Sequence, residues 1–408
     1  MNETLQHALK KYVLAALFGT IGGFITVLVV LLLDEGIKLI WEHAFGIDPS
    51  APTQTAMVFV TMLVATLLVG FMVNRYGKTK AGLEELLHEI LQEGTVKWRK
   101  LPKALLMAFP SLLSGASLGP EAPAAIASIG ATSFIADKQR MNTDDTQNAN
   151  IAAYSGMLGA VLSSPFLSPA MIAESAKSSV EKMRALLTTS VIASAFGTAT
   201  FFFVFGQIFV FHLPEQTYAG SGYVELLVAF VIGLGGALFG AAMAKVLALT
   251  NKAFDAVAKN DTQLVIITGV VVSVLMFIMP ITMFSGQHTL DNLFAYGVSA
   301  GFFGLLLAAI IKLASTGLLI RAGFVGGAVF PAIFAGAAFG LALNQLFNVS
   351  PMAAAGAATV GLLAVLLKQP VSAAILTLLI FGFNSGAVVA CGLAGAMLVF
   401  LMTPKKSQ

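Results

Sequence analysis

Glu121 is the residue whose type and surroundings most clearly point to chemistry. It lies in the segment 114–123, SGASLGPEAP, which interrupts apolar sequence with glycine and proline. A carboxylate at the depth of a lipid bilayer is costly, so its default interpretation is functional. The Pro-Glu-Ala-Pro run also has the form of a helix start, where free N–H groups and the positive end of the helix dipole converge. This combination predicts an anion site. The plainer alternative is a helix-start acid stabilised by the dipole.

A second break with the same character lies about two hundred residues later. Residues 323–331 read GFVGGAVFP, and the small-residue stretch 332–340 follows them. Each break is followed by a polar pair, a proline and apolar residues, at 163–170 and at 368–375. Interrupted segments in matching positions of two halves are typical of inverted-repeat transporters with a site at the midplane. Small residues in such stretches also permit close helix packing.

The composition restricts the fold to a helical membrane protein. The 408 residues are 57% hydrophobic and 11% charged, and the mean hydropathy is +0.88. We expect an all-α integral membrane fold, and the paired breaks predict an inverted repeat of broken helices. We expect one transmembrane domain over 1–408, with a first half at about 12–211, a second half at about 223–402, and no soluble regulatory domain. Six apolar runs are clear: 12–33, 56–73, 187–211, 223–248, 262–284 and 296–320.

Charge and the rarer residue types exclude several functions. The net charge is only +3, which gives no support for nucleic-acid binding. Basic residues near both termini and in 75–103 place the termini on the cytoplasmic side of a multi-pass protein of the cell (inner) membrane. The single cysteine, Cys391, is expected to be a packing residue. The five histidines lack metal-ligand spacing, so we predict no metal site, no cofactor and no catalytic residue.

Four motifs in order resemble the CLC family of chloride channels and proton-coupled anion antiporters. Residues 118–123, LGPEAP, resemble its G-[RK]-E-G-P motif, and 326–331, GGAVFP, resemble its G-x-F-x-P motif. Residues 284–288 resemble a glycine-rich turn of its second half. The Ser164-Pro165 and Gln369-Pro370 pairs match its two Ala-Pro positions. The resemblance runs from about 12 to 402, with departures typical of a divergent bacterial branch.

The resemblance implies a CLC-type fold of two antiparallel halves, built from tilted and broken helices that often do not span the membrane. It also implies a homodimer in which each subunit holds its own anion pathway, lined by helix N-termini and backbone amides. Glu121 matches the gating glutamate, whose protonation or displacement would open the path. The anion-binding positions that it implies are Gly119, Pro120 and Ala122 at the first break and Gly327, Ala328, Val329 and Phe330 at the second. The partners are then membrane lipid, an inorganic anion and a second copy of the chain.

Two family features are altered at the inner end of the implied pathway. The G-S-G-I-P motif is not recognisable, and the corresponding segment 76–84 offers the Thr79 hydroxyl and the Lys78 charge. The alternative is that these are basic-segment residues at a membrane edge. The inner proton-path glutamate aligns with Ser175, next to Glu174, so Glu174 is a possible proton-path residue or else a solvated helix-end acid. No tyrosine follows Tyr296 to match the family's central tyrosine.

These features predict chloride transport, with the altered relay and tyrosine favouring passive or weakly proton-coupled conduction. The alternatives are a proton-coupled chloride or fluoride antiporter and an inverted-repeat transporter of another solute. An intramembrane enzyme is a further class, for which the chain offers no nucleophile–base pair. Lys312, inside an apolar run, is expected to have a structural role by reaching the interface or pairing with a carbonyl.

Overall fold

The computed structural model describes residues 3–79, 82–176, 178–206, 222–287, 289–347 and 349–402. The stretch 207–221 between the expected halves, including the expected limit at 211, and the basic residues after 402 lie outside these ranges, as do Lys80 and His288. The described chain is helical, and its one isolated β-bridge joins Gly119 to Gly327. The α-helices are α1 (Glu3–Lys38), α2 (Met57–Tyr76), α3 (Leu83–Glu93), α4 (Leu101–Leu113), α5 (Glu121–Lys138), α6 (Thr143–Val161), α7 (Leu167–Ser175), α8 (Val180–Phe205), α9 (Tyr223–Val257), α10 (Asp261–Ile278), α11 (Leu290–Ala322), α12 (Val329–Phe347), α13 (Pro351–Leu367), α14 (Pro370–Phe381) and α15 (Gly386–Met402).

Short segments extend or connect these helices. A π-helical turn, Leu39–Ala44, continues α1, and 3-10 turns occupy Trp98–Lys100, Pro280–Thr282 and Phe383–Ser385. Local sequence explains many ends: Asn142 and Asn260 accept hydrogen bonds as N-caps of α6 and α10. Gly323 ends α11 in the left-handed region that glycine tolerates. The broken helices are therefore encoded in the local sequence.

Within the described ranges, seven helices are long and apolar enough to cross a membrane, and α13, α14 and α15 are shorter apolar helices. Such a set is expected of tilted and non-spanning helices in a hydrocarbon layer about 30 Å thick. The protein is therefore a multi-pass membrane protein, as its composition predicts.

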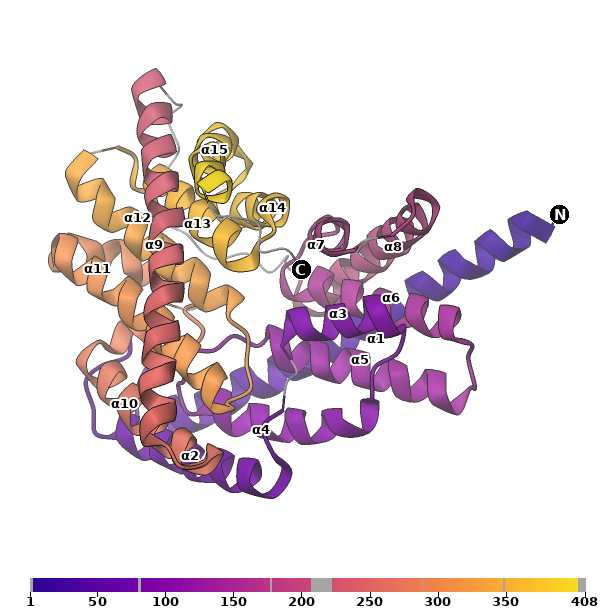
Figure 1. Cartoon of the computed structure of the whole chain (residues 1–408), viewed down its shortest axis with the longest axis horizontal. Helices are drawn as coiled ribbons and strands as arrows, with labels where there is room; N and C mark the ends of the chain where they lie inside the picture. The colour runs from indigo at the N-terminus through magenta and orange to yellow at the C-terminus, as the bar shows by residue number, and fades with distance from the viewer. Residues whose placement is uncertain are drawn as a thin grey trace.

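The two halves repeat one packing arrangement, shown by the indigo-to-magenta and the orange-to-yellow parts of Figure 1. In the first half, α1, α6 and α8 pack on one another, and in the second half α9, α13 and α15 do the same. Glycines lie at the centre of each group of three helices. In the first half Gly156 lies against Gly19 and Gly197, and in the second half Gly361 and Gly392 lie against Gly233. A Cβ at Gly156 or Gly361 would overlap a neighbouring helix backbone, so these helices approach as closely as small residues allow.

The halves also contact each other along two lines. Helix α2 packs on α10 at the lower left of Figure 1, and α7 packs on α14 near its upper centre. Helix α11 changes direction at Gly301, where φ is 61° and ψ is −167°. This change of direction is one of the helix breaks that an inverted repeat of broken helices contains, and the fold class is confirmed.

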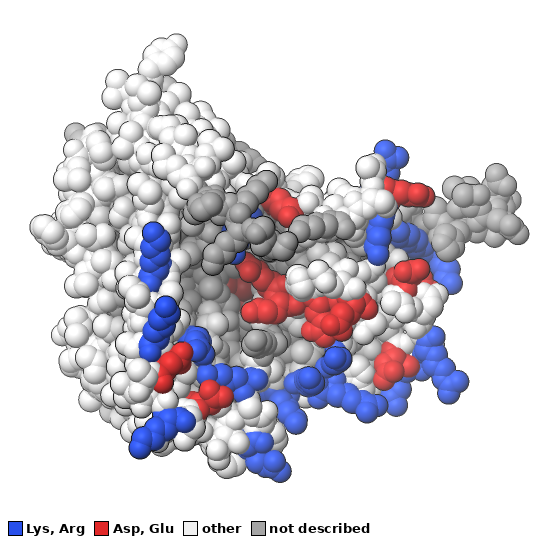
Figure 2. Space-filling view, viewed as in Figure 1, with Lys and Arg blue, Asp and Glu red and all other residues white. Residues whose placement is uncertain are grey.

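Charged side chains are confined to part of the face seen in Figure 2. Acidic side chains gather over α3, whose first turn holds Glu84 and Glu85. Lysines and arginines lie along the margin below them, and much of the remaining surface is uncharged. Within α3, burial of the side chain and the nearby negative charge of Glu85 raise the pKa of Glu84. This charged region is the part of the visible face suited to water rather than lipid.

Candidate functional site

The first break positions Glu121 at the start of a helix in the protein interior. Pro120 precedes the first residue of α5, so Glu121 stands in the first turn with its side chain fully buried. No described lysine, arginine or histidine forms a salt bridge with it. The local field is therefore supplied by backbone dipoles rather than by an opposite charge in contact.

The second break brings another helix start to the same place. Gly119 N–H donates to the Gly327 carbonyl, and Gly327 N–H donates to the Gly119 carbonyl, both at 2.8 Å. Val329, the first residue of α12, donates its N–H to Glu121 Oε1 at 2.8 Å. The Glu121 carboxylate therefore lies at the meeting point of the α5 and α12 N-termini, one from each half.

Glycine is required at both ends of the bridge for steric reasons. A Cβ at Gly119 or at Gly327 would overlap the Glu121 carboxylate. Neither glycine has a positive φ, so their role is close approach rather than backbone freedom. The two glycines are close to Glu121 and Val329 along the chain, and the structure shows that the two breaks contact each other.

The carboxylate is held on one side only. Glu121 Oε1 accepts the bond from Val329, whereas the buried Oε2 has no hydrogen-bond partner among the described residues. A buried oxygen without a partner is unfavourable and calls for a specific explanation. Glu121 is therefore a buried carboxylate at two helix N-termini with one of its two oxygens unpartnered among the described residues.

A hydroxyl network fixes the first break to α11. The Ser117 and Thr316 hydroxyls lie 2.9 Å apart, and Thr316 Oγ1 donates to the Ser117 carbonyl at 2.8 Å. Phe284 N–H donates to the Gly115 carbonyl at 2.8 Å. Trp41 Nε1 donates to the Leu113 carbonyl at 2.9 Å and its ring packs edge-on against Phe284. These partners lie tens to hundreds of residues away from the break, and no local signal identifies them.

A cavity of about 260 Å³, called the outer cavity below, lies beside the first break. Leu118 and Pro120 from the first break line it, together with Phe284, Ser285 and Gln287 from the turn that precedes α11. Glu121 itself is fully buried and does not line this cavity. The cavity is therefore lined by Pro120, the residue before Glu121, and not by Glu121 itself.

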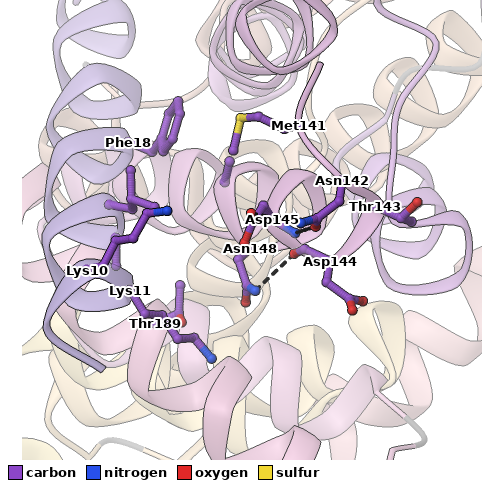
Figure 3. Close-up of a pocket in the computed structure, with 13 residues that line it drawn as sticks. Lys10, Lys11, Phe18, Met141, Asn142, Thr143, Asp144, Asp145, Asn148 and Thr189 are labelled. Carbon is purple, nitrogen blue, oxygen red and sulfur yellow. Dashed lines mark hydrogen bonds between the residues drawn. The ribbon is translucent and has the colours of Figure 1, made fainter. Parts of the chain in front are cut away.

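A larger cavity of about 520 Å³ lies elsewhere and is not part of this site. Figure 3 shows it between α1, the start of α6 and Thr189 of α8, with Lys10 and Lys11 on one side. Asp144 and Asp145 also line it, and Asn148 Nδ2 donates to the Asp144 carbonyl at 2.9 Å. None of its lining residues comes from either break, so size does not identify the functional site here.

Lys78 and Thr79, the residues expected at the inner end of the pathway, have other partners. Lys78 Nζ forms a salt bridge with Asp261 Oδ1 at 2.8 Å, and its stem lies beside Gly323. The Thr79 hydroxyl donates to Met107 Sδ at 3.4 Å. Neither residue forms a hydrogen bond or salt bridge with Glu121 or the 327–330 turn among the described residues. Their role in an anion pathway stays a prediction.

Glu174 occupies a second contact between the halves. Its Oε1 accepts from Val371 N–H at 2.8 Å, and its Oε2 accepts from the Ser372 N–H at 2.9 Å and the Ser372 hydroxyl at 2.6 Å. Beside it, Gln369 Nε2 donates to Ser175 Oγ at 2.7 Å. Glu174 therefore caps the N-terminus of α14 from across the two halves, a role that sequence reasoning missed. Its place in a proton path stays a prediction.

Comparison with known proteins shows the family. The family model described as "Voltage gated chloride channel" matches residues 65–401. The protein YfeO of Salmonella newport (strain SL254), named for ion transport, is 25% identical over 323 residues, covering 78% of this chain and 76% of that protein. YfeO of Salmonella choleraesuis (strain SC-B67) is 26% identical over 298 residues, covering 72% and 71%.

Solved structures agree on the fold. A slow cyanobacterial Cl⁻/H⁺ antiporter superposes with a TM-score of 0.82 at 16% identity, covering 97% of this chain and 95% of that one. A CLC-type fluoride/proton antiporter gives 0.69 at 16% identity, covering 98% and 96%. The family model spans both breaks and the junction of the α5 and α12 N-termini. The chain belongs to the voltage-gated chloride channel family, the CLC family.

Proposed function

We propose that this protein conducts chloride across the cell (inner) membrane through a pathway that Glu121 closes, one pathway in each subunit of a homodimer. Membership of a channel family indicates anion transport rather than catalysis. Backbone amides and helix N-termini would be the direct ligands of the anion. The termini are proposed to face the cytoplasm, as the basic segments indicate.

One observation carries the proposal: the Glu121 carboxylate occupies the place where two helix N-termini meet. Its Oε1 takes the amide proton of Val329, while its Oε2 has no partner among the described residues. A carboxylate oxygen and a chloride ion make the same demand on an N–H group, since both accept hydrogen bonds with negative charge. Glu121 would therefore be the occupant that a transported anion must replace.

Opening then requires the carboxylate to leave its seat. Protonation would remove the charge that the α5 and α12 N-termini stabilise, and an incoming anion would compete for the Val329 amide. Ala328 and Phe330 flank that amide at the start of α12, while Gly119, Pro120 and Ala122 flank the gate on the other side. The outer cavity beside Pro120 would deliver the anion.

Passive or weakly proton-coupled conduction is proposed rather than tight exchange. The Glu174 carboxylate is engaged by three donors of α14, which suits a structural cap better than a mobile proton carrier. The alternative is proton-coupled exchange of chloride or fluoride, the activity named for the two solved structures above. Fluoride is the first anion to try if chloride does not move.

Chloride efflux from proteoliposomes, recorded together with external pH, tests the proposal. Wild type should release chloride without stoichiometric proton uptake. Glu121→Ala should release it about tenfold faster, because roughly 1.4 kcal/mol of competition for the site would be lost. Glu181→Ala removes an exposed acid at the start of α8 and serves as the control, with wild-type flux expected.

The outcomes separate the candidates. Alkalinisation that persists against a proton gradient would show an antiporter. An unchanged chloride flux in Glu121→Ala would contradict the proposal that Glu121 closes the pathway. No chloride flux in either protein, followed by fluoride flux, would change the substrate and leave the pathway in place.

A further inference from the structure

Lys312 of α11 is a buried cation that the proposed gate does not use. Its side chain is fully buried, and its ammonium contacts three backbone carbonyls: Thr282 at 3.0 Å, Met283 at 3.0 Å and Phe284 at 2.8 Å. Carbonyls only accept hydrogen bonds, and a neutral amine has two hydrogens to donate whereas an ammonium has three. Three acceptors at these distances therefore fit the charged form. The pairing with carbonyls that the sequence predicts is confirmed.

The ring of Phe334 adds to the same site. Lys312 Nζ lies 4.8 Å from the ring centroid, within the range of a cation–π contact. Phe334 belongs to α12, the helix whose first amide binds Glu121. A side chain added at Gly286 would overlap Phe334 and crowd the aliphatic part of Lys312. The cation is thus enclosed between the 282–286 turn and α12.

Lys312 stands behind the wall of the outer cavity. Phe284, whose carbonyl it binds, lines that cavity together with Pro120. The N–H of Phe284 donates to Gly115, at the beginning of the first break. One helical turn further on, Thr316 binds Ser117 of the same break. The charge is therefore connected to the gate loop by two short hydrogen-bonded links.

The charge has no described acid against it. None of the salt bridges among the described residues includes Lys312. A unit charge in a weakly polar interior acts over longer distances than one in water. Because its three N–H bonds are all donated to carbonyls, the ammonium has none left to hold an anion.

We propose that Lys312 is the fixed positive charge of the anion pathway, one that attracts anions toward the Glu121 site without ligating them. The proposal rests on the proposed anion pathway and deepens it. It resolves a conflict in the selection of anions: a lysine in direct contact would hold the ion too long, whereas amides alone give a weaker attraction. It predicts that removing the charge weakens anion binding while the amide ligands stay in place.

The test is chloride binding by calorimetry to purified protein in the Glu121→Gln background. The glutamine removes the competing carboxylate, so the Kd for chloride then depends directly on the charge of Lys312. Lys312→Met, of similar length but without charge, should raise the Kd for chloride on the order of tenfold. In wild type, the same substitution should change the Kd less, because the Glu121 carboxylate loses the same attraction as the ion. Lys103→Met removes an exposed lysine and should leave the Kd within about twofold, since surface charges are screened.

Structural damage is separated from loss of charge by a second variant and a second readout. Lys312→Gln keeps one donor group and is measured if Lys312→Met does not fold, with folding followed by thermal unfolding in detergent. A folded Lys312 variant whose chloride Kd equals that of its Glu121→Gln parent would overturn the proposal and leave Lys312 as a clamp on the turn. A Glu121→Gln parent that binds no chloride would instead contradict the proposed function.

Discussion

Two carboxylates of the first half reach across the molecule to a helix N-terminus of the second half, and their surroundings differ. Glu174 reaches α14, and both of its carboxylate oxygens accept hydrogen bonds, from three donor groups of Val371 and Ser372. Glu121 reaches α12, where the Val329 N–H donates to Oε1, while Oε2 has no hydrogen-bond partner among the described residues. The same combination of acid and helix dipole therefore serves a saturated cap in one place and an incomplete seat in the other.

The difference extends to the space around each acid. Gly119 and Gly327 leave no room for a methyl group beside Glu121, which is fully buried. Glu174 is partly exposed and needs no such glycine. A cap that is already satisfied gains nothing by moving. An acid with an unpaired buried oxygen loses little by leaving, so we assign movement to Glu121 and rigidity to Glu174.

The largest expected effect is at Gly327. Alanine there would overlap the Glu121 carboxylate, and we expect a loss of stability of about 2 kcal/mol, typical of overpacking in a tight site. Thermal unfolding in detergent measures it. Gly386→Ala is the matched control, since a Cβ at Gly386 meets nothing within 4 Å.

The Gly327 effect should depend on Glu121. In a Glu121→Ala background the overlapping side chain is absent, so Gly327→Ala should cost much less than in wild type. An equal cost in both backgrounds would mean that the glycine serves the backbone bridge to Gly119 and not the seat of the carboxylate.

The next effect is at Glu174. Glu174→Ala removes the cap of α14 and should lower stability by about 1 kcal/mol, as loss of an N-cap does. Chloride flux per folded protein should stay at the wild-type level, in contrast with Glu121→Ala. A Glu174 variant of normal stability with altered proton movement would reverse the comparison and restore Glu174 to a proton path.

The smallest effect is at Ser372. Ser372→Ala removes only the hydroxyl that donates to Glu174 Oε2, because the backbone N–H remains. We expect a loss of about 0.5–1 kcal/mol, the net value of one hydrogen bond. Unfolding of Ser372→Ala, Glu174→Ala and the double variant forms a cycle. Additive losses would show that Ser372 and Glu174 act independently and would contradict the shared cap.

Local sequence was sufficient to predict the two breaks and to single out Glu121 as a buried acid. Glycine and proline mark 114–123 and 323–331, and Glu121 is conspicuous because a carboxylate is rare at such depth. The helical membrane fold follows from the same composition and periodicity. The breaks, the buried acid and the apolar helices follow from residue types within a few positions of one another, which is why they can be predicted.

The contacts between the breaks could not be predicted in the same way. The Gly119–Gly327 bridge and the Glu174 cap each join residues about two hundred positions apart. The sequence identifies Lys312 as a residue that could pair with a carbonyl, but not that Phe284 and its neighbours supply three. The roles of Lys78 and Thr79 depend on an inner pathway that the motif pattern does not specify.

Chloride binding to wild type and Glu121→Gln tests most directly the claim that the Glu121 carboxylate occupies an anion site. Glutamine keeps the shape of the side chain and removes its charge, so it should compete poorly for the Val329 amide. Calorimetry should then give a chloride Kd about tenfold lower for Glu121→Gln than for wild type. An equal or higher Kd in the variant would contradict the account, because the carboxylate would then not be holding the place of the ion.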